Sequence, residues 1–196
     1  MKVIGLTGNS GCGKGVVAEI MSKYGAFVLD CDKIAHDNMK PFGIAYGEIV
    51  EAFGDGILNE DCTINRRILG SIVFKYKEKL ILLNSITHKY VVEVINNAIR
   101  LNRDKNVIVI DAPLLIEAGL QRYCDSVWAV YAPLEVRLER VIKRDNIDRK
   151  GALLRFQNQM NIEELKRYSD VIIENNCSLE ELEEIVLEKM KEYDII

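Results

Sequence analysis

Five short runs of apolar, mostly β-branched residues predict the strands of one buried sheet. They lie at residues 2–6, 26–29, 107–110, 127–131 and 171–173. Each run is continuously apolar rather than alternating, which is typical of parallel strands covered on both faces. Segments with helical spacing lie between them, at 16–24, in much of 34–103, and at 134–146, 149–160 and 179–193. Strands that alternate with helices predict an α/β fold in three layers, a five-stranded parallel sheet flanked by helices.

The last predicted helix carries a sequence signal for its first turn. Ser178 can accept a hydrogen bond from the backbone of Glu181, while the Glu181 carboxylate reaches back to the backbone of Ser178. This S-x-x-E capping box predicts that the helix begins directly after Ser178.

The interval between the second and third predicted strands is far longer than the crossover between two parallel strands requires. Apolar positions within it recur at helical spacing, as at Ile68, Leu69, Ile72 and Val73. We therefore expect a helical insertion over residues 34–103. A second, highly charged helical excursion is expected over residues 134–164. The core of a single domain then comprises about residues 1–33, 104–133 and 165–196.

Composition limits the class of protein. No apolar run in the 196 residues approaches the roughly 20 that a membrane helix needs, and the apolar start reads as a strand rather than a leader. The five cysteines are widely spaced and contain no C-x-x-C pair, which favours a reducing compartment. A net charge of −4 argues against bulk affinity for nucleic acid. We therefore expect a cytoplasmic protein with no membrane or nucleic-acid partner.

A phosphate-binding motif follows the first predicted strand. Residues 8–14, Gly-Asn-Ser-Gly-Cys-Gly-Lys, fit G-x-x-x-x-G-K, and a helix is predicted directly after them. Glycines let successive backbone N–H groups converge on phosphate oxygens, and Lys14 adds a mobile ammonium. An ordinary glycine-rich turn is the alternative, but the strand before it and the helix after it favour a nucleotide-binding loop. Cys12 lies near the start of that helix, where a thiolate is favoured, so it is a candidate for oxidation.

The motif departs from its full form after the lysine. A Ser or Thr there ligates Mg²⁺, whereas this chain has Gly15 followed by Val16, and neither side chain carries an oxygen. We hypothesise that Mg²⁺ still binds through ATP phosphates, waters and a carboxylate such as Asp32 or Asp111, with weaker affinity.

Carboxylates follow two of the predicted strands. Asp30 and Asp32 come directly after the second strand, and Asp111 follows the third. Ligands of parallel sheets gather at the carboxyl ends of the strands, where phosphoryl transfer needs a base and a metal-holding carboxylate. The alternative for Asp32 is that it only caps the next helix.

Three arginines are spaced along one face of the charged helix. Arg137, Arg140 and Arg144 recur at i, i+3 and i+7, so their guanidinium groups could clamp a migrating phosphoryl group. A solvated charged face is the alternative, since Glu139 and Lys143 form an i,i+4 pair.

These segments occur in an order that resembles the dephospho-CoA kinases along nearly the whole chain. The matching segments in the first half are I-G-L-T-G-x-x-G-x-G-K at the start, D-C-D-K-I-A-H at 30–36, residues 64–70 followed by Val73 and Phe74, and His88. Those in the second half are D-A-P-L-L-I-E at 111–117, Ala132 and Pro133 with the three arginines, Gln159, and D-V-I-I-E-N at 170–175. Each match is weak alone, but their order is specific.

The resemblance implies a P-loop kinase fold and transfer of the ATP γ-phosphate to the ribose 3′-hydroxyl of dephospho-CoA, the last step of coenzyme A synthesis. It implies a CoA-binding role for the 34–103 insertion and a lid over 134–164. Catalytic roles fall to Asp32 as base, to Lys14 and to Arg140. ATP would contact Gly8, Asn9, Ser10, Gly11, Cys12, Gly13, Lys14, Gly15, Val16, Arg144 and Asn175. Dephospho-CoA would contact Asp32, His88, Asp111, Pro113, Leu114, Leu115 and Arg140.

Three other interpretations remain open at this point. The loop alone does not name the acceptor, so a kinase for another small acceptor, such as a nucleoside monophosphate, is one of them. A nucleotide-dependent switch is disfavoured because the sequence has no N-K-x-D segment. The third is a binding-only relative that lost activity with the change at Gly15. A monomer is favoured, with ATP, Mg²⁺ and dephospho-CoA as the small molecules bound.

Overall fold

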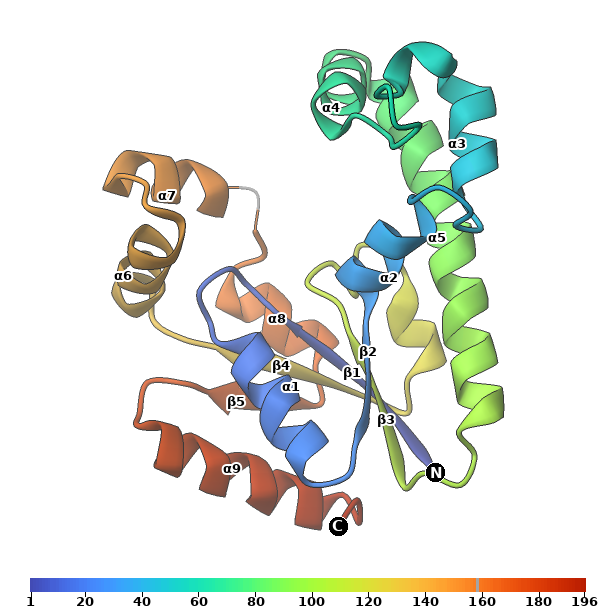
Figure 1. The fold of residues 1–196 in the computed structure, drawn as a ribbon. Coiled ribbons are helices and arrows are strands. Elements are labelled where there is room, and N and C mark those ends of the chain that lie inside the picture. Colours follow the sequence, from blue (N-terminus) through green and yellow to red (C-terminus); the bar gives the residue numbers. More distant parts are fainter. Residues whose placement is uncertain (158) are drawn as a thin grey trace. The chain divides into compact units, whose positions relative to one another are not determined.

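The computed structural model describes residues 1–157 and 159–196, which form two compact units, one of residues 1–29 with 102–196 and one of residues 30–101 (Figure 1). In chain order the elements are β1 (Lys2–Gly8), α1 (Lys14–Lys23), β2 (Phe27–Asp30), α2 (Cys31–Asn38), α3 (Tyr46–Phe53), η1 (Asp55–Ile57), α4 (Arg66–Lys75), α5 (Lys77–Leu101), β3 (Val107–Asp111), η2 (Leu120–Tyr123), β4 (Ser126–Tyr131), α6 (Leu134–Asp145), α7 (Arg149–Phe156), α8 (Ile162–Tyr168), β5 (Val171–Glu174) and α9 (Leu179–Glu192).

The predicted five-stranded sheet is confirmed, and its strand order is β2-β3-β1-β4-β5. β1 pairs in parallel with both β3 and β4, and β4 pairs in parallel with β5. The register places Leu6 opposite Asp111 on one side and Trp128 on the other. The turn after β1 therefore leaves the sheet between the carboxyl ends of two neighbouring strands, the edge where ligands of parallel sheets bind.

Helices cover both faces of this sheet, as predicted. Ile4 and Leu6 of β1 point to one face and are fully buried against residues of α1 and α9, which lie side by side there (Figure 1). Gly5 points to the other face, where a Cβ would come within 2.7 Å of both Leu115 and Cys124. The alternation of side chains along β1 thus builds a core on each face.

The charged excursion forms a small helical pair followed by a separate helix. α6 and α7 enclose a core of Leu138, Val141 and Ala152. The predicted helix 149–160 ends earlier, at Phe156, and α8 follows it. α8 was not predicted, although Asn161 and Glu164 form a capping box at its start. The lid role of residues 134–164 stays a prediction.

The unit of residues 30–101 is helical, as the spacing predicted. The residues of its core come from α3, η1, α4 and α5 and from Ala45 directly before α3. They are Ala45, Ile49, Ile57, Leu69, Val73 and Ile86. The CoA-binding role of this unit stays a prediction.

The start of α2 shows which aspartate caps this helix. The Asp30 carboxylate accepts a hydrogen bond from the Lys33 N–H at 2.9 Å, so Asp30 is the N-cap. Asp32 lies exposed in the first turn of the helix. The interpretation of Asp32 as the helix cap is therefore wrong.

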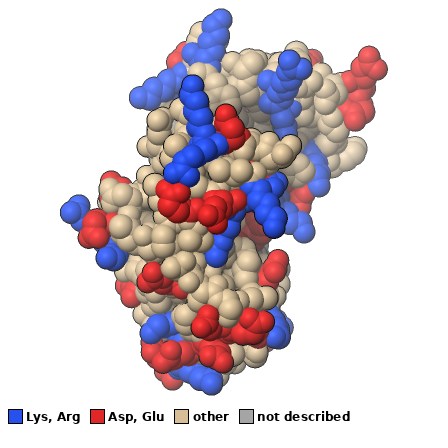
Figure 2. All heavy atoms as spheres, turned by 90° about the vertical axis from the view of Figure 1, so that its left-hand side faces the viewer, with Lys and Arg blue, Asp and Glu red and all other residues tan. Residues whose placement is uncertain are grey.

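The surface carries both signs of charge close together. On the face that Figure 2 displays, Lys and Arg side chains are interspersed with Asp and Glu side chains. Within residues 1–157 and 159–196, none of the helices combines the length and the apolar character that crossing a bilayer requires.

Candidate active site

The predicted phosphate loop connects the end of β1 to the start of α1, as the motif requires. β1 ends at Gly8 and α1 begins at Lys14. Gly11 and Gly13 have φ values of 81° and 91°, in the left-handed region that favours glycine. A Cβ at Gly11 would come within 2.6 Å of the Arg137 carbonyl oxygen, and one at Gly13 within 2.0 Å of Asn175 Nδ2. Both glycines are thus required by backbone conformation and by close neighbours.

Side chains from α6 and from the end of β5 hold three consecutive carbonyl groups of this loop. Arg137 Nε donates to the Ser10 oxygen at 3.0 Å, and Asn175 Nδ2 donates to the Cys12 oxygen at 2.8 Å. Arg140 donates to the Gly11 and Cys12 oxygens at 3.4 Å and to Asn175 Oδ1 at 3.3 Å. With these carbonyl groups bound from outside, the loop keeps the turned conformation that collects backbone N–H groups around an anion.

Replacing Gly13 with alanine is expected to disrupt this arrangement. Alanine at this position would have to adopt the left-handed backbone conformation. Its Cβ would also clash with the buried Asn175 amide, which holds the Cys12 carbonyl group. We expect ATP affinity to fall by about tenfold or more and the unfolding temperature to drop, because a strained residue costs about 1–3 kcal/mol before the clash is counted. Isothermal calorimetry with ATP and a thermal melt measure the two effects.

Gly25→Ala is the matched control for Gly13→Ala. Gly25 has a φ of 95°, almost the same as that of Gly13, but a Cβ there meets no atom within 4 Å. The control should lose stability without losing ATP affinity. Equal affinity losses in both variants would contradict the role of close packing at the loop.

Lys14 and Asp111 form an ion pair at the carboxyl edge of the sheet. The Lys14 ammonium donates to Asp111 Oδ1, and the two side chains are only 17% and 10% exposed. Asp111 ends β3 and lies opposite Leu6 in the sheet register, which places it beside the loop that follows β1. A partly buried ammonium at the start of a helix, next to a carboxylate, is suited to phosphate and to the metal that accompanies it.

Two cavities flank the loop. The first, here called the Pro113 cavity, has a volume of about 250 Å³ and is lined by residues 8–10 with Pro113, Leu114, Glu117 and Gln159. The second, the Asn175 cavity, has a volume of about 220 Å³ and is lined by Gly13, Val16, Arg140 and Asn175 with residues 177–179 and Leu182. A ligand in either cavity would touch the loop.

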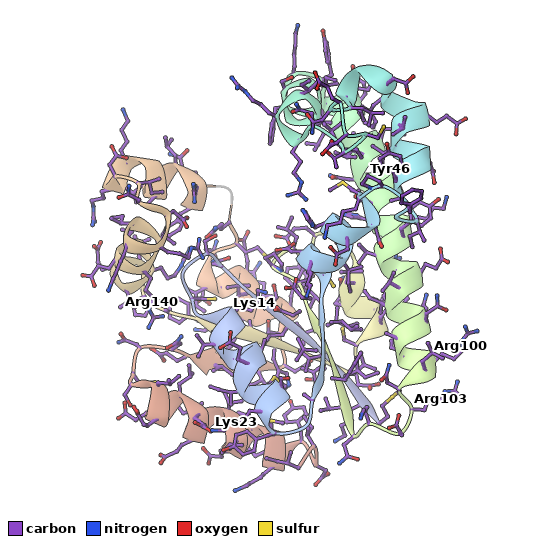
Figure 3. The ribbon with its side chains drawn as sticks, in the orientation of Figure 1. Lys14, Lys23, Tyr46, Arg100, Arg103 and Arg140 are labelled. Atoms are coloured by element: carbon purple, nitrogen blue, oxygen red, sulfur yellow. The ribbon has the colours of Figure 1, made fainter. Side chains whose placement is uncertain are left out.

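The arginines of α6 do not act alike. Arg137 is buried and Arg140 half-buried, and both reach the loop from outside. Figure 3 shows Arg140 on the same side of the first unit as Lys14, whereas Lys23 lies at the far end of α1. Arg144 instead pairs with Asp145 at 2.7 and 3.0 Å, and its side chain is 62% exposed. The structure thus brings two of the three predicted guanidinium groups to the loop, and the role of Arg144 stays a prediction.

Two expectations about the site need correction. Leu115 is fully buried, where it packs beneath Gly5, so it supports its segment from the core instead of contacting a ligand as Leu114 can. Cys12 is 1% exposed. Burial raises the pKa of the Cys12 thiol, and this effect outweighs the hydrogen bond from the Lys14 backbone. The prediction of a reactive thiolate at Cys12 is therefore wrong.

The remaining predicted residues lie in the helical unit. Asp32 is in the first turn of α2, and His88 is exposed on α5. Their roles stay predictions.

Some lining residues were not predicted from the sequence. Glu117 lies in the Pro113 cavity, and Ser178 and Leu179 line the Asn175 cavity at the start of α9. Asn9 Nδ2 donates to the Met160 carbonyl at 2.7 Å, a contact between segments 151 positions apart. The capping box at Ser178 was the available signal, because a helix that begins a few residues after the carboxyl end of a strand lies near the ligand-binding edge.

Comparison with known proteins gives a consistent family. The family model described as dephospho-CoA kinase matches residues 2–181. A dephospho-CoA kinase of Aquifex aeolicus is 42% identical over 181 residues, which cover 92% of each chain. One of Carboxydothermus hydrogenoformans is 40% identical over 189 residues, which cover 95% of this chain and 92% of the relative.

Solved structures share the fold. The dephospho-CoA kinase from Campylobacter jejuni superposes with a TM-score of 0.72 at 28% identity, covering 97% of this chain and 96% of that one. The protein TT1252 from Thermus thermophilus gives a TM-score of 0.83 at 31% identity, covering 97% of both chains. A shikimate kinase from Acinetobacter baumannii, 15% identical with a TM-score of 0.51 and covering 100% of this chain and 96% of that one, shares the fold alone. Because the family model spans most of the chain and close relatives cover nearly all of it, this protein belongs to the dephospho-CoA kinase family.

Proposed function

We propose that this protein transfers the γ-phosphoryl group of ATP to the ribose 3′-hydroxyl of 3′-dephospho-CoA, giving CoA and ADP. The observation that carries the proposal is the loop of residues 8–14, which contributes to the walls of two cavities and whose Lys14 pairs with Asp111. Membership of the family supplies the acceptor, because a phosphate loop by itself does not identify one. The alternative of a nucleoside monophosphate acceptor is not favoured.

The donor would occupy the loop and the Asn175 cavity. Backbone N–H groups of the loop and the N-terminus of α1 attract the β- and γ-phosphates, and Lys14 adds a full positive charge. The adenosine then lies in the Asn175 cavity, which offers the apolar side chains of Val16 and Leu179 and the polar group of Ser178. Arg140 completes this side: its hydrogen bonds of 3.3–3.4 Å are long, so its guanidinium group is weakly held and can turn to phosphate oxygens.

The acceptor ribose would lie in the Pro113 cavity, where Pro113 and Leu114 offer an apolar wall and Glu117 and Gln159 offer hydrogen-bonding groups. We assign Asp32 as the general base. The 3′-oxygen forms a bond to the γ-phosphorus, the bond from that phosphorus to the bridging β–γ oxygen breaks, and the hydroxyl proton passes to the Asp32 carboxylate. Transfer to a positioned carboxylate contributes roughly 10²–10⁴-fold to such a rate.

The residues present fit Mg²⁺ only in part. Gly15 has no side-chain oxygen to offer, whereas the Asp111 and Asp32 carboxylates are ligands that this hard cation prefers. One such carboxylate, Asp111 or Asp32, would hold it directly or through water. When bound, Mg²⁺ neutralises charge on the β- and γ-phosphates.

Gly15→Ser is expected to restore the missing ligand. A Cβ at Gly15 meets no atom within 4 Å, so a serine fits without displacing a neighbour. We expect the Mg²⁺ concentration at half-maximal turnover to fall by up to about tenfold, the lower end of what metal-site groups contribute to affinity. Gly15→Ala is the control, because it adds a Cβ and also raises helix propensity but brings no side-chain oxygen. An unchanged Mg²⁺ requirement in Gly15→Ser would contradict the proposed cause of weak metal binding.

One assay tests the function itself. The purified protein is mixed with ATP and Mg²⁺ and with dephospho-CoA, AMP or no acceptor, and ADP release is followed by a coupled assay while mass spectrometry identifies the product. ADP release that requires dephospho-CoA and yields CoA supports the proposal. Faster release with AMP would favour the nucleoside monophosphate alternative, and tight ATP binding without turnover would favour a binding-only relative.

A further inference from the structure

Arg137 is a buried cation that the proposed reaction does not use. It lies in the first turns of α6 with 8% of its surface exposed. Its guanidinium group donates to the Ser10 carbonyl at 3.0 Å and to Gln159 Oε1 at 2.5 Å, and it stacks over the Phe156 ring at 4.3 Å from the centroid. One side chain therefore joins the phosphate loop, the end of α7 and the segment after it.

The charge of Arg137 is not neutralised by a carboxylate. Across the part of the chain that the structure describes, residues 1–157 and 159–196, no Asp or Glu oxygen lies within ion-pair distance of it. A buried cation is costly unless its donors are satisfied. Here a carbonyl, a side-chain amide and an aromatic face satisfy it, and all three are neutral. The positive charge therefore adds to the potential that attracts phosphate to the loop.

Both hydrogen-bond partners of Arg137 also line the Pro113 cavity. Ser10 and Gln159 contribute to its wall, and a second contact parallels the first, because Asn9 Nδ2 binds the Met160 carbonyl at 2.7 Å. A shift of Gln159 would thus be passed to the Ser10 carbonyl through one rigid guanidinium group. Its planar fork fixes the direction of both bonds, which a flexible ammonium would not do.

We propose that Arg137 is a positioning residue that couples occupation of the Pro113 cavity to the geometry of the phosphate loop, so that the acceptor and the nucleotide strengthen each other's binding. The inference rests on the proposed function, because it takes dephospho-CoA as the occupant of the cavity. Coupling between two sites is reciprocal, and values of about 5- to 150-fold are typical.

The test measures binding of the non-hydrolysable analogue AMP-PNP with and without saturating dephospho-CoA, by calorimetry. In the wild type we expect dephospho-CoA to tighten AMP-PNP binding by at least about fivefold. Arg137→Met keeps an unbranched side chain but removes the charge and the donors, and the tightening should disappear. Gln159→Leu removes the hydrogen-bond acceptor of Arg137 on the cavity side, and the tightening should disappear in this variant too. Arg149→Met is the control, because Arg149 pairs with Glu135 on the surface.

The outcomes separate coupling from a structural role. Loss of tightening in both variants, with no further loss in the double variant, supports the proposal. An Arg137→Met protein that melts at a lower temperature but keeps the wild-type tightening overturns it, as does a wild type without tightening. If Arg137→Met does not fold, Gln159→Leu and Arg137→Lys decide: retained tightening in both overturns the proposal.

Failure of the proposed function would look different. A wild-type protein that does not phosphorylate dephospho-CoA in the turnover assay removes the named acceptor. The binding of AMP-PNP alone still reports on Arg137 in that case, since loosening of the Ser10 carbonyl should weaken it about ten- to a hundredfold, the range for hydrogen bonds to a charged group.

Discussion

Replacing Lys14 with methionine is expected to lower kcat/KM for ATP by about 10²–10³-fold, the cost of removing one group that stabilises charge in the transition state. Methionine keeps most of the length of the side chain and removes the ammonium. Asp111 then loses its Lys14 partner, and its negative charge repels the incoming phosphates. ATP affinity and turnover should therefore both fall. Steady-state ADP release with dephospho-CoA measures the ratio, and calorimetry with ATP measures the affinity.

Lys23→Met is the matched control, because the same helix offers the same substitution at its other end. Lys23 ends α1 and pairs with Glu183, with 62% of its side chain exposed (Figure 3). It should keep wild-type activity. A comparable loss in both variants would mean that α1 itself has been damaged. Activity of Lys14→Met within about threefold of wild type would mean that the ammonium does not act on the transferred phosphate.

The double variant Lys14→Met/Asp111→Asn separates the effect of losing the Lys14 ammonium from the effect of repulsion by the Asp111 carboxylate. Removing the carboxylate relieves its repulsion of phosphate, so the affinity for ATP in the absence of Mg²⁺ should recover in part. Turnover should stay low, because the ammonium is still missing. A full recovery of turnover would show that repulsion by Asp111, and not the loss of Lys14, caused the defect.

Local patterns were sufficient for the sheet and the loop. The continuous apolar runs reflect burial of the strands on both faces, and burial of that kind depends little on the rest of the chain. The glycines at 11 and 13 could be predicted because positive φ and close packing exclude other residues there. The start of α9 was predicted for a similar reason, since a capping box satisfies backbone N–H groups within one turn.

Features set by tertiary packing could not be predicted in this way. Burial of Cys12 beneath Gly8 outweighs the favourable start of α1, so its thiol is protected rather than reactive. Helical spacing predicted the same role for Arg137 and Arg144. The structure differs because the packing of α6 buries Arg137, whereas Arg144 pairs with Asp145. Helix α8 was missed because the helical pattern was assigned only as far as residue 160, and the capping signal of Asn161 and Glu164 lies directly after that segment.

Asp32→Asn is expected to separate chemistry from binding. Asparagine has nearly the same shape but cannot take the proton of the 3′-hydroxyl, so kcat should fall by roughly 10²–10⁴-fold. ATP affinity should change by less than about threefold, because phosphate binding relies on the loop and on Lys14. Helix α2 should be unaffected, since its N-cap is Asp30 and not Asp32. Single-turnover rates give the chemical step, and calorimetry with ATP gives the affinity.

Asp37→Asn is the control on the same helix. Asp37 lies in the last turn of α2 and pairs with Lys40, so its replacement removes an equal charge away from the end of β2. It should keep wild-type turnover, and equal losses of turnover and of ATP affinity in Asp32→Asn would make Asp32 a structural residue instead of the base. A loss of turnover that high Mg²⁺ restores would instead assign Asp32 to the metal, because a base cannot be replaced by more cation whereas a weakened ligand can be offset by mass action.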